Sequence, residues 1–412
     1  MEQIIKPRPI EGSISAIASK SQAHRLLICA ALADRKSEIL CPETSKDIEA
    51  TAMCLSALGA EIAYENGVYT VSPLTQPPKK AILPCSESGS TLRFLLPVAG
   101  ALGVEATFVL EGRLPERPLS PLWEEMERHG CKLSRPTKST LLCQGKLQPG
   151  RYRLAGNVSS QFLSGLLFAL PLLNEASELE LTTALESASY VDMTRAALSE
   201  FGIRQQGWHI VPQGYRSPGY CAVEGDWSNA AFWLCAGAIS RGVTVTGLNP
   251  DSPQGDRKIL AVLENFGAAV SRKNGAITVE PRPLRAGEVD ARDIPDLVPP
   301  IALLAACAEG KTRISGAERL KIKESDRLQS VARTLKALGG QVEVTQDGLL
   351  ITGSRLSGGK VDSFQDHRIA MLAAIASCRC TGSVILTGAE AVKKSYPRFW
   401  EDFSRMQKEE LI

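Results

Sequence analysis

The chain has 412 residues, more than a single hydrophobic core usually serves, so we expect two domains. Its hydrophobic (44%) and charged (22%) fractions are ordinary for a soluble globular protein, and a net charge of +2 gives no overall basic field for nucleic acid. The sequence has no uninterrupted apolar run of about 18 residues and no N-terminal signal segment, so we expect no membrane span.

The first 18 residues predict a short strand segment, after which a polar stretch leads directly into an apolar one. Ser19–Arg25 is polar, whereas residues 26–33 are apolar on every helical face, which is typical of a helix buried on all sides. The serines suit the capping of backbone N–H groups at a helix start. Lys20 and Arg25 lie at the electropositive end of this helix, where cations are unfavourable unless an anion joins them. A solvated basic cap is an equally good interpretation of this stretch alone.

An amphipathic helix and a hairpin follow. Thr44–Asp47 opens the helix, and Gly59 stands where a helix C-terminus favours glycine. Asn66-Gly67 then separates two short β-type stretches, which is a good hairpin signal. We therefore expect each unit of the chain to contain a strand, a buried helix, a strand, an amphipathic helix and a hairpin.

This pattern recurs along the whole chain with a period of about 70 residues. Polar loops lead into apolar helices at Lys20, Gly89, Ser159, Asp226, Asp296 and Asp366. Glycines that end the amphipathic helices keep the same period at Gly59, Gly130, Gly202, Gly267 and Gly339. Two independent markers thus indicate a sixfold internal repeat, with the sixth copy of the second marker missing or degenerate. An equal division of six units places a domain boundary near residues 221–225.

Basic side chains gather at these loop-to-helix junctions. The junction cations are Lys20, Arg25, Arg93, Arg117, Arg327, Arg368 and Lys394. Arginine binds phosphate or carboxylate in a bidentate manner, lysine adds a point charge, and helix N-termini add partial positive charge. Short neutral donors suited to phosphate and hydroxyl groups accompany them: Ser21, Ser159, Ser160, Gln161 and Ser187. The pattern predicts a ligand with several negative charges, although a surface salt bridge is the ordinary role of any single arginine.

Two carboxylates stand apart from the rest. Asp296 begins an apolar helix, where it could simply cap the backbone, and Glu324 lies inside a cationic run, where it could simply pair with its neighbours. Both are also placed to act as acid or base near a phosphate site. His367 is at least as suited to capping or orienting as to catalysis. No GxxxxGK[ST], HExxH or GxSxG motif is present, and no GxGxxG follows a strand, which argues against the corresponding chemistries.

Eleven cysteines make an odd set, and Cys29, Cys235 and Cys307 lie within apolar helices. This indicates reduced, buried thiols in a cytoplasmic protein rather than a disulfide framework. Cys378 and Cys380 lack a second ligand pair at zinc spacing, so we interpret them as structural.

In order and spacing, these motifs closely resemble those of the EPSP synthases (3-phosphoshikimate 1-carboxyvinyltransferases) of the enolpyruvyl transferase family, over essentially the full length. The matching motifs are Ser19-Lys20-Ser21 with Arg25, Ser88-Gly89-Ser90-Thr91 with Arg93, Glu116-Arg117-Pro118, Val158-Ser159-Ser160-Gln161-Phe162, Ile294-Pro295-Asp296, Lys323-Glu324-Ser325-Asp326-Arg327, Asp366-His367-Arg368 and Lys394-Ser395-Tyr396-Pro397. The resemblance implies an α/β fold, namely a two-domain inside-out α/β barrel of six βαβαββ repeats, three per domain, with buried helices and outer sheets. It also implies a discontinuous domain of residues 1–18 and 224–412, an inserted domain of residues 19–223, and an active site in the cleft between them.

The resemblance further implies transfer of the enolpyruvyl group of phosphoenolpyruvate to the 5-hydroxyl of shikimate 3-phosphate by addition and elimination, as part of the shikimate pathway. It implies no cofactor, no metal, no nucleic-acid or membrane partner, and a cytoplasmic monomer of a kind targeted by glyphosate. Among the implied catalytic residues, Asp296 takes the hydroxyl proton, Glu324 protonates the methylene carbon and Lys20 assists near the bridging oxygen. The implied shikimate 3-phosphate ligands are Lys20, Ser21, Arg25, Ser159, Ser160, Gln161, Ser187, Tyr190, Asp296, Arg319 and Lys323. The implied phosphoenolpyruvate ligands are Lys20, Gly89, Arg117, Gln161, Arg327, Arg368 and Lys394.

Two positions depart from the family pattern. Glu87 stands where many members have Asn, and we expect its charge to point away from the ligand. Arg319 stands where some relatives offer Asn to the shikimate phosphate, a contact that an arginine could also make.

Two other functions compete with this interpretation. The sister enzyme that acts on UDP-N-acetylglucosamine commonly has a reactive Cys in the loop corresponding to residues 112–118. This chain has no Cys there, and it has Lys20-Ser21 where the sister enzyme has Lys-Asn. A non-catalytic anion-binding relative is the second alternative, and the intact Asp296, Glu324 and Lys20 argue against it.

Overall fold

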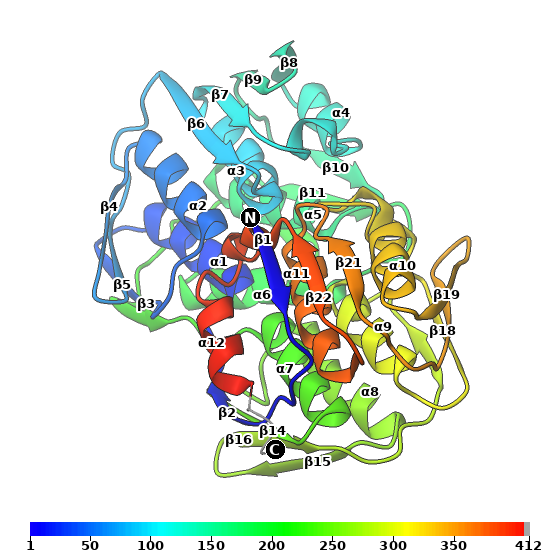
Figure 1. The fold of residues 1–412 in the computed structure, drawn as a ribbon. Coiled ribbons are helices and arrows are strands. Elements are labelled where there is room, and N and C mark those ends of the chain that lie inside the picture. The colour runs from blue at the N-terminus through cyan, green and yellow to red at the C-terminus, as the bar shows by residue number, and fades with distance from the viewer. Residues whose placement is uncertain (408–412) are drawn as a thin grey trace. The chain divides into compact units, whose positions relative to one another are not determined.

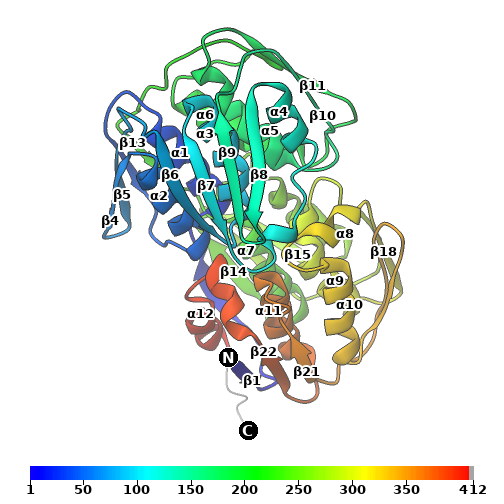
Figure 2. The same ribbon diagram turned by 90° about the horizontal axis from the view of Figure 1, so that it is seen from above.

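The computed structural model describes residues 1–407, and the chain divides into two compact units. Unit 1 is Met1–Ile17 together with the chain from Glu224 onward, and unit 2 is Ala18–Val223. Ala18, which the sequence places with the residues before it, groups with unit 2, where its N–H donates to the Glu43 carboxylate at 3.2 Å. Figures 1 and 2 show the course of the chain from two directions.

In unit 2, helices alternate with strands. The helices are α1 (Lys20–Ala31), α2 (Lys46–Ala57), α3 (Gly89–Leu102), α4 (Leu122–Arg128), α5 (Ser160–Ala169) and α6 (Ala188–Glu200), with 3₁₀ turns η1 (Leu114–Glu116) and η2 (Leu170–Leu172). The strands are β3 (Ser37–Leu40), β4 (Glu61–Glu65), β5 (Val68–Ser72), β6 (Lys80–Ser86), β7 (Glu105–Leu110), β8 (Cys131–Thr137), β9 (Thr140–Gly145), β10 (Arg151–Leu154), β11 (Ser177–Leu181), β12 (His209–Ile210) and β13 (Tyr220–Ala222). They form sheets in the orders β13-β3-β5-β4, β6-β7-β9-β8 and β10-β11-β12.

Unit 1 repeats this plan. Its helices are α7 (Trp227–Ile239), α8 (Ile259–Asn265), α9 (Val298–Ala306), α10 (Arg327–Ala337), α11 (His367–Ala376) and α12 (Phe399–Met406), with 3₁₀ turns η3 (Gly255–Lys258), η4 (Pro295–Leu297), η5 (Glu318–Ile322), η6 (Ser377–Arg379) and η7 (Ala389–Lys394). Its strands are β1 (Glu2–Ile5), β2 (Gly12–Ser15), β14 (Val243–Thr246), β15 (Ala269–Lys273), β16 (Ala276–Glu280), β17 (Glu288–Asp290), β18 (Lys311–Ser315), β19 (Gln341–Val344), β20 (Leu349–Thr352), β21 (Gly359–Asp362) and β22 (Val384–Thr387). The sheet orders are β2-β14-β16-β15, β17-β18-β20-β19 and β21-β22-β1. The fold is therefore α/β with mixed sheets.

The four-stranded sheets share one construction, a parallel pair followed by an antiparallel hairpin. In β6-β7-β9-β8, for example, β6 and β7 are parallel and α3 lies between them in the sequence, while β8 and β9 form the hairpin. A parallel pair needs a long crossover, which the helix provides. The predicted hairpin is wrong for the third and sixth repeats, whose sheets have three strands. There, the two-residue β12 and the N-terminal β1 occupy the position beside β11 and β22.

Two strands, β2 and β13, each precede a buried helix in the sequence but pair with a strand of the other unit from that helix. β2 precedes α1 in the sequence but pairs in parallel with β14, whereas β13 precedes α7 but pairs in parallel with β3. The chain therefore leaves unit 1 after β2, builds unit 2, adds β13 as its final strand and then returns.

The helices α1, α3, α5, α7, α9 and α11 are the buried ones, as the sequence predicted. Every residue of α7, α9 and α11 is buried, and one apolar core in each unit packs these helices against the strands and the amphipathic helices. At the ends of α2, α4, α6, α8 and α10 the predicted glycines all have positive φ: Gly59, Gly130, Gly202, Gly267 and Gly339. This confirms the second marker of the repeat, because a left-handed residue after a helix favours glycine.

Side chains cap the N-termini of most of the buried helices. Side chains of Ser19, Ser88, Ser159, Asp226 and Asp366 accept backbone N–H groups at the starts of α1, α3, α5, α7 and α11. α9 differs, because η4 precedes it and Leu297 takes the cap position. Asp296 is therefore not a cap, which leaves its carboxylate for other contacts.

All eleven cysteines are free thiols and nine are buried, which agrees with the prediction. Among residues 1–407, no helix combines the length and apolar character needed to cross a bilayer.

Candidate active site

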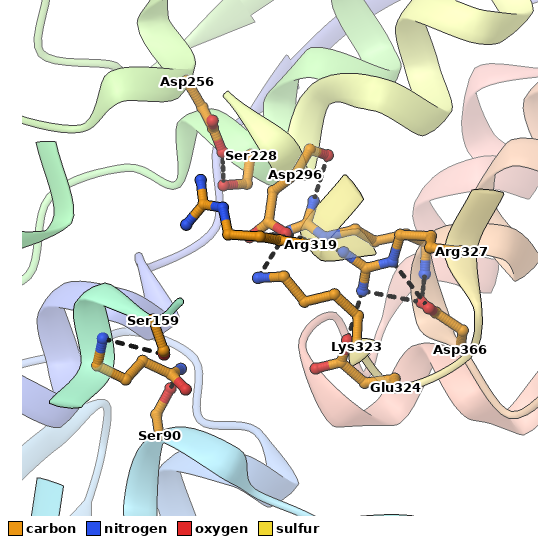
Figure 3. A network of polar contacts seen from close by, with 12 residues as sticks. Ser90, Ser159, Ser228, Asp256, Asp296, Arg319, Lys323, Glu324, Arg327 and Asp366 are labelled. Carbon is orange, nitrogen blue, oxygen red and sulfur yellow. Dashed lines mark hydrogen bonds and ion pairs between the residues drawn. The ribbon is translucent and has the colours of Figure 1, made fainter. Parts of the chain in front are cut away.

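The centre of the candidate site in unit 1 is Arg327, whose side chain is only 1% exposed. Its Nε donates to Asp366 Oδ2 at 2.9 Å, its Nη1 to Asp296 Oδ1 at 2.9 Å, and its Nη2 to Glu324 Oε2 at 2.6 Å. Figure 3 shows these contacts converging on the guanidinium. Burial alone would lower the pKa of Arg327, but the three carboxylates raise it above its ordinary value. Arg327 is therefore a permanent cation within an anionic shell.

Asp366 anchors this shell. It is fully buried and caps α11 by accepting the Arg368 N–H at 3.0 Å. It also accepts the Ser325 hydroxyl at 3.1 Å, in addition to its contacts with Arg327. The sequence marked Asp366 as a helix start but did not assign it to the site. The pairing has no local sequence signal, because Asp366 lies 39 residues after Arg327.

Asp296 connects the same shell to two further cations. Arg368 Nη2 donates to Asp296 Oδ2 at 3.1 Å, and Lys323 Nζ lies 3.8 Å from Oδ1. Burial alone would raise the pKa of Asp296, but Arg368, Lys323 and Arg327 hold it well below its usual range. Asp296 is therefore an ionised carboxylate at neutral pH.

Glu324 is more accessible, with 21% of its side chain exposed. It pairs with Arg327 three residues later, as its position in the cationic run predicts. Asp326 caps α10 by accepting the Gln329 N–H at 3.2 Å, which fixes where the helix and Arg327 begin. The structure thus brings Asp296, Lys323, Glu324, Arg327 and Arg368 together.

Lys394 and Arg319 bind backbone carbonyls on neighbouring turns. Lys394 Nζ donates to the Gln365 carbonyl at 2.8 Å, in a turn where Phe364 and Gln365 have φ of 52° and 56°. This left-handed turn leads directly into Asp366 and α11. Arg319 Nη2 donates at 2.7 Å to the carbonyl of Arg292, which lies in the loop between β17 and η4.

In unit 2, Lys20 is the first residue of α1 and its ammonium donates to Asp47 Oδ2 at 2.8 Å. Asp47 lies in the first turn of α2, so an acidic side chain already compensates the cation placed at the electropositive helix end. In the sequence, Asp47 is recognisable only as part of a helix start.

Arg25 is buried in unit 2 among neutral acceptors. Its Nε donates to Thr194 Oγ1 at 2.9 Å, its Nη1 to the Ser21 carbonyl at 2.5 Å, and its Nη2 to the Tyr190 carbonyl at 2.8 Å. The guanidinium also lies 5.0 Å from the centre of the Phe94 ring. Burial lowers the pKa of Arg25 to about 10, which still leaves it charged at neutral pH. The structure therefore brings Ser21, Arg25 and Tyr190 together around a positive charge.

Gly89, the first residue of α3, is closely approached by two guanidinium groups. A Cβ at this position would be 2.6 Å from Arg117 Nη1 and 2.8 Å from Arg93 Nη1. Arg93 in turn donates to Gln161 Oε1 at 2.9 Å, and Gln161 Nε2 donates to Ser90 at 2.9 Å. Gly89, Arg117 and Gln161 thus form one continuous group at the starts of α3 and α5.

The predicted serines lie at the starts of other helices in this unit. Ser159 caps α5 through the Gln161 N–H, Ser160 is the first residue of that helix and is buried, and Ser187 precedes α6 with a left-handed φ of 54°. The Glu87 carboxylate lies beside Gly112, where an added Cβ would be 2.6 Å away. Its orientation relative to a ligand stays a prediction.

Two buried hydrogen-bond chains hold these helix starts in place. His24 Nδ1 contacts Thr51 Oγ1 at 2.6 Å, and Thr51 Oγ1 contacts Thr91 Oγ1 at 2.6 Å, which links α1, α2 and α3. Thr194 Oγ1 contacts Ser164 at 2.7 Å and accepts from Arg25, which links α5, α6 and α1. Burial, with Lys20 and Arg25 nearby, holds the pKa of His24 well below its usual value, so this histidine is neutral. Sequence patterns contain no signal for such chains, because each partner comes from a different helix.

We expect Asp366→Ala to lower the free energy of unfolding by about 3–5 kcal/mol, since it removes the innermost carboxylate and leaves Arg327 partly unpaired. Urea denaturation would measure the loss. Glu264→Ala is the matched control, because Glu264 pairs at 2.8 Å with Arg272 on the surface, where ion pairs contribute about 1 kcal/mol or less. Equal losses in the two variants would contradict the anchoring role of Asp366.

A family model described as EPSP synthase (3-phosphoshikimate 1-carboxyvinyltransferase) matches residues 4–403. A 3-phosphoshikimate 1-carboxyvinyltransferase of Clostridium kluyveri is 44% identical over 410 residues, which cover 97% of this chain and 96% of that protein. The protein of the same name from Clostridium acetobutylicum is 41% identical over 414 residues, covering 98% and 96%.

Solved structures agree with these relatives. An EPSP synthase from Acinetobacter baumannii has a TM-score of 0.81 and 26% identity, with 98% of each chain covered. The enolpyruvyl transferase NikO from Streptomyces tendae, at 20% identity and a TM-score of 0.78, shares the fold over 98% of this chain and 97% of that one. The family match over nearly the whole chain, together with relatives of this identity, shows that the chain belongs to the EPSP synthases, the 3-phosphoshikimate 1-carboxyvinyltransferases.

Proposed function

We propose that the two groups of side chains described above bind the substrates of the EPSP synthase reaction and carry out its proton transfers. The chain transfers the enolpyruvyl group of phosphoenolpyruvate to the 5-hydroxyl of shikimate 3-phosphate and releases phosphate. The observation that carries the site assignment is the Arg327 cluster. In it, Arg327 donates hydrogen bonds to both Asp296 and Glu324, and a second arginine, Arg368, also donates to Asp296. Such a cluster provides both acid–base groups and anion-binding groups.

Phosphoenolpyruvate carries a phosphate and a carboxylate, so its binding requires several cations. We assign this role to Lys20, Gly89, Arg117, Gln161, Arg327, Arg368 and Lys394. In unit 1, Arg327 and Arg368 already hold the Asp296 carboxylate, a geometry that suits carboxylate and phosphate oxygens in general. In unit 2, the small Gly89 leaves room for the guanidinium of Arg117.

Shikimate 3-phosphate requires a phosphate site and hydroxyl partners. We assign it Lys20, Ser21, Arg25, Ser159, Ser160, Gln161, Ser187, Tyr190, Asp296, Arg319 and Lys323. Arg25 supports this assignment, because its hydrogen-bond partners are neutral and a phosphate would supply the missing negative charge. The partly buried Asp296–Lys323 edge of the cluster offers an acceptor and a donor to sugar-like hydroxyls.

The proton transfers follow from the charges. In the addition step, the 5-hydroxyl oxygen bonds to C2 of phosphoenolpyruvate, Asp296 accepts the hydroxyl proton and Glu324 delivers a proton to the methylene carbon. In the elimination step, that carbon returns a proton to Glu324, the C–O bond to phosphate breaks, the double bond re-forms and the departing phosphate takes up the proton held by Asp296. The low pKa of Asp296 keeps it ionised as a base, and Lys20 assists at the bridging oxygen. Arg327 holds both carboxylates in fixed positions throughout.

The domain bounds, the barrel form, the cellular location and the oligomeric state are proposals as well. We propose two domains, residues 1–17 with 224–412 and residues 18–223, each an inside-out α/β barrel of three repeats, of which two keep the full βαβαββ pattern. The shared strand order of the four-stranded sheets supports the repeats. We further propose a cytoplasmic monomer without nucleic-acid or membrane partners, supported by the free cysteines and the near-zero net charge.

Phosphate release from phosphoenolpyruvate tests the substrate assignment. We expect turnover with shikimate 3-phosphate and none above background with UDP-N-acetylglucosamine. The Asp296→Asn variant serves as the control for background hydrolysis, because it removes the proposed base and keeps the side-chain shape. Turnover with the nucleotide sugar alone would identify the sister activity, and phosphoenolpyruvate binding without turnover would identify a non-catalytic relative.

Replacing Arg117 or Arg368 with Ala should raise the KM for phosphoenolpyruvate about tenfold or more, because each change removes charge-assisted hydrogen bonds worth about 1.5–3 kcal/mol. Steady-state kinetics at saturating shikimate 3-phosphate would measure this. Arg272→Ala removes a surface arginine and should leave the KM unchanged. A normal KM in the Arg117 or Arg368 variant would refute the corresponding assignment.

Gly89→Ala should weaken the binding of both phosphoenolpyruvate and its mimic glyphosate. The added methyl displaces the Arg117 and Arg93 guanidinium groups, whose flexible ends can move without unfolding α3. The KM for phosphoenolpyruvate and the inhibition constant for glyphosate are the quantities to compare. Gly214→Ala is the control, since nothing lies within 4 Å of a Cβ there. Unaltered binding of both ligands would count against the placement of Gly89.

A further inference from the structure

A second buried carboxyl lies near the Arg327 cluster and has no role in the mechanism above. Asp256, in η3, is 3% exposed. Its Oδ2 accepts a short hydrogen bond from the Ser228 hydroxyl, whereas its Oδ1 is buried without a hydrogen-bond partner. Figure 3 shows the Asp256–Ser228 pair in the same view as Asp296. A buried carboxylate with one partner is costly, so this carboxyl favours the neutral form.

The charges around Asp256 come from several elements of unit 1. Asp296 of η4 and Asp226 at the start of α7 are like charges, and Arg368 of α11 is the nearby cation. The cations of its own turn are engaged elsewhere, since Arg257 donates to the Pro250 carbonyl and Lys258 pairs with Asp293. Asp226 is itself occupied as the cap that accepts the Asn229 N–H at 2.7 Å. The field at Asp256 is therefore set mainly by Asp296 and Arg368.

These surroundings separate the titration of the two carboxyls. Burial and the charge of Asp296 raise the pKa of Asp256 to about 7, against the opposing effects of Arg368 and Ser228. Asp296, with three cations, stays ionised throughout the neutral range. A pair of carboxyls whose environments push their pKa values apart is typical of acid–base sites.

We propose that Asp256 is a positioning residue of the reaction. When its carboxyl is neutral, Arg368 interacts fully with Asp296 and phosphoenolpyruvate. When it is ionised, its negative charge weakens both of these interactions of Arg368. The inference rests on the proposed roles of Arg368 and Asp296. Loss of the Asp256 proton adds a negative charge beside Arg368, so the affinity for the anionic substrate falls as the pH rises through neutrality. Asp256 itself touches no reacting atom in this scheme.

Asp256→Asn tests this role, because the amide keeps the shape and can still accept from Ser228 but cannot ionise. We expect the ratio of the wild-type KM for phosphoenolpyruvate to that of the variant to rise several-fold between pH 6 and pH 8.5, with a midpoint near 7. Ionisation of the substrate itself cancels in this ratio. Ser228→Ala removes a group that lowers the pKa of Asp256. When the KM ratio is measured with Ser228→Ala present in both proteins, its midpoint should therefore lie at a higher pH. A ratio that does not change with pH would overturn the proposal.

Thermal unfolding gives a readout that does not depend on substrate. A carboxyl whose pKa is higher in the folded state stabilises the protein below its unfolded pKa, and this stability is lost as the pH rises towards the folded value. The Tm of Asp256→Asn minus that of wild type should therefore increase between pH 5 and pH 8, whereas Asp293→Asn, at an exposed site, should show no such trend. A flat difference for Asp256→Asn would overturn the proposal.

The two experiments also separate this inference from the site assignment. A rising Tm difference with a constant KM ratio would show that Asp256 titrates without positioning Arg368, and would overturn the proposal while leaving the site intact. A normal KM in Arg368→Ala would overturn the assignment of Arg368 and, with it, this inference.

Discussion

The guanidinium of Arg327 is the constraint on which unit 1 depends. Burying a charge with almost no exposure is costly, and here three closely placed carboxylates compensate it. Its three partners come from the start of α11, from η4 and from the turn before α10, so satisfying one arginine fixes those three segments relative to one another. Two of these partners are the proposed acid and base. The interaction that the fold requires is therefore the same one that orients the catalytic carboxylates.

Unit 2 treats its central charge differently. Arg25 is surrounded by a hydroxyl and two carbonyls, and the buried Thr194–Ser164 pair that it joins is neutral as well. The desolvation of this guanidinium is thus only partly offset by the protein. Unit 1 compensates its buried cation with carboxylates, whereas unit 2 leaves a buried positive potential that a phosphate can satisfy. This difference matches the proposed division between proton transfer and phosphate binding.

Sequence patterns predicted the repeated α/β plan and many of the residues that gather in the candidate site. The period of about 70 residues, the capping serines and the helix-ending glycines all depend on local chemistry, and local chemistry is readable from one chain. The contacts that patterns missed are non-local: Asp47 opposite Lys20, Asp366 opposite Arg327, and the hydroxyl chain from His24 to Thr91. Asp296 shows the same limit, because its apparent cap position is replaced by a 3₁₀ turn in which its carboxylate faces Arg327. The hairpin predicted for the sixth repeat failed for a related reason, since β1, which pairs with β22, comes from the far end of the sequence. In the third repeat a single two-residue strand, β12, pairs with β11 in place of the predicted hairpin.

The pairing of β2 with β14 and of β13 with β3 has a consequence for biosynthesis. Unit 2 is contiguous, so the ribosome delivers all of its strands, β13 included, in one uninterrupted stretch. β2 must instead wait for β14, more than 220 residues later in translation, and β1 must wait for β22, more than 370 residues later. A nascent chain can therefore complete the inserted unit while the other still lacks its partners. Strands β1 and β2 are therefore synthesised long before the strands with which they pair.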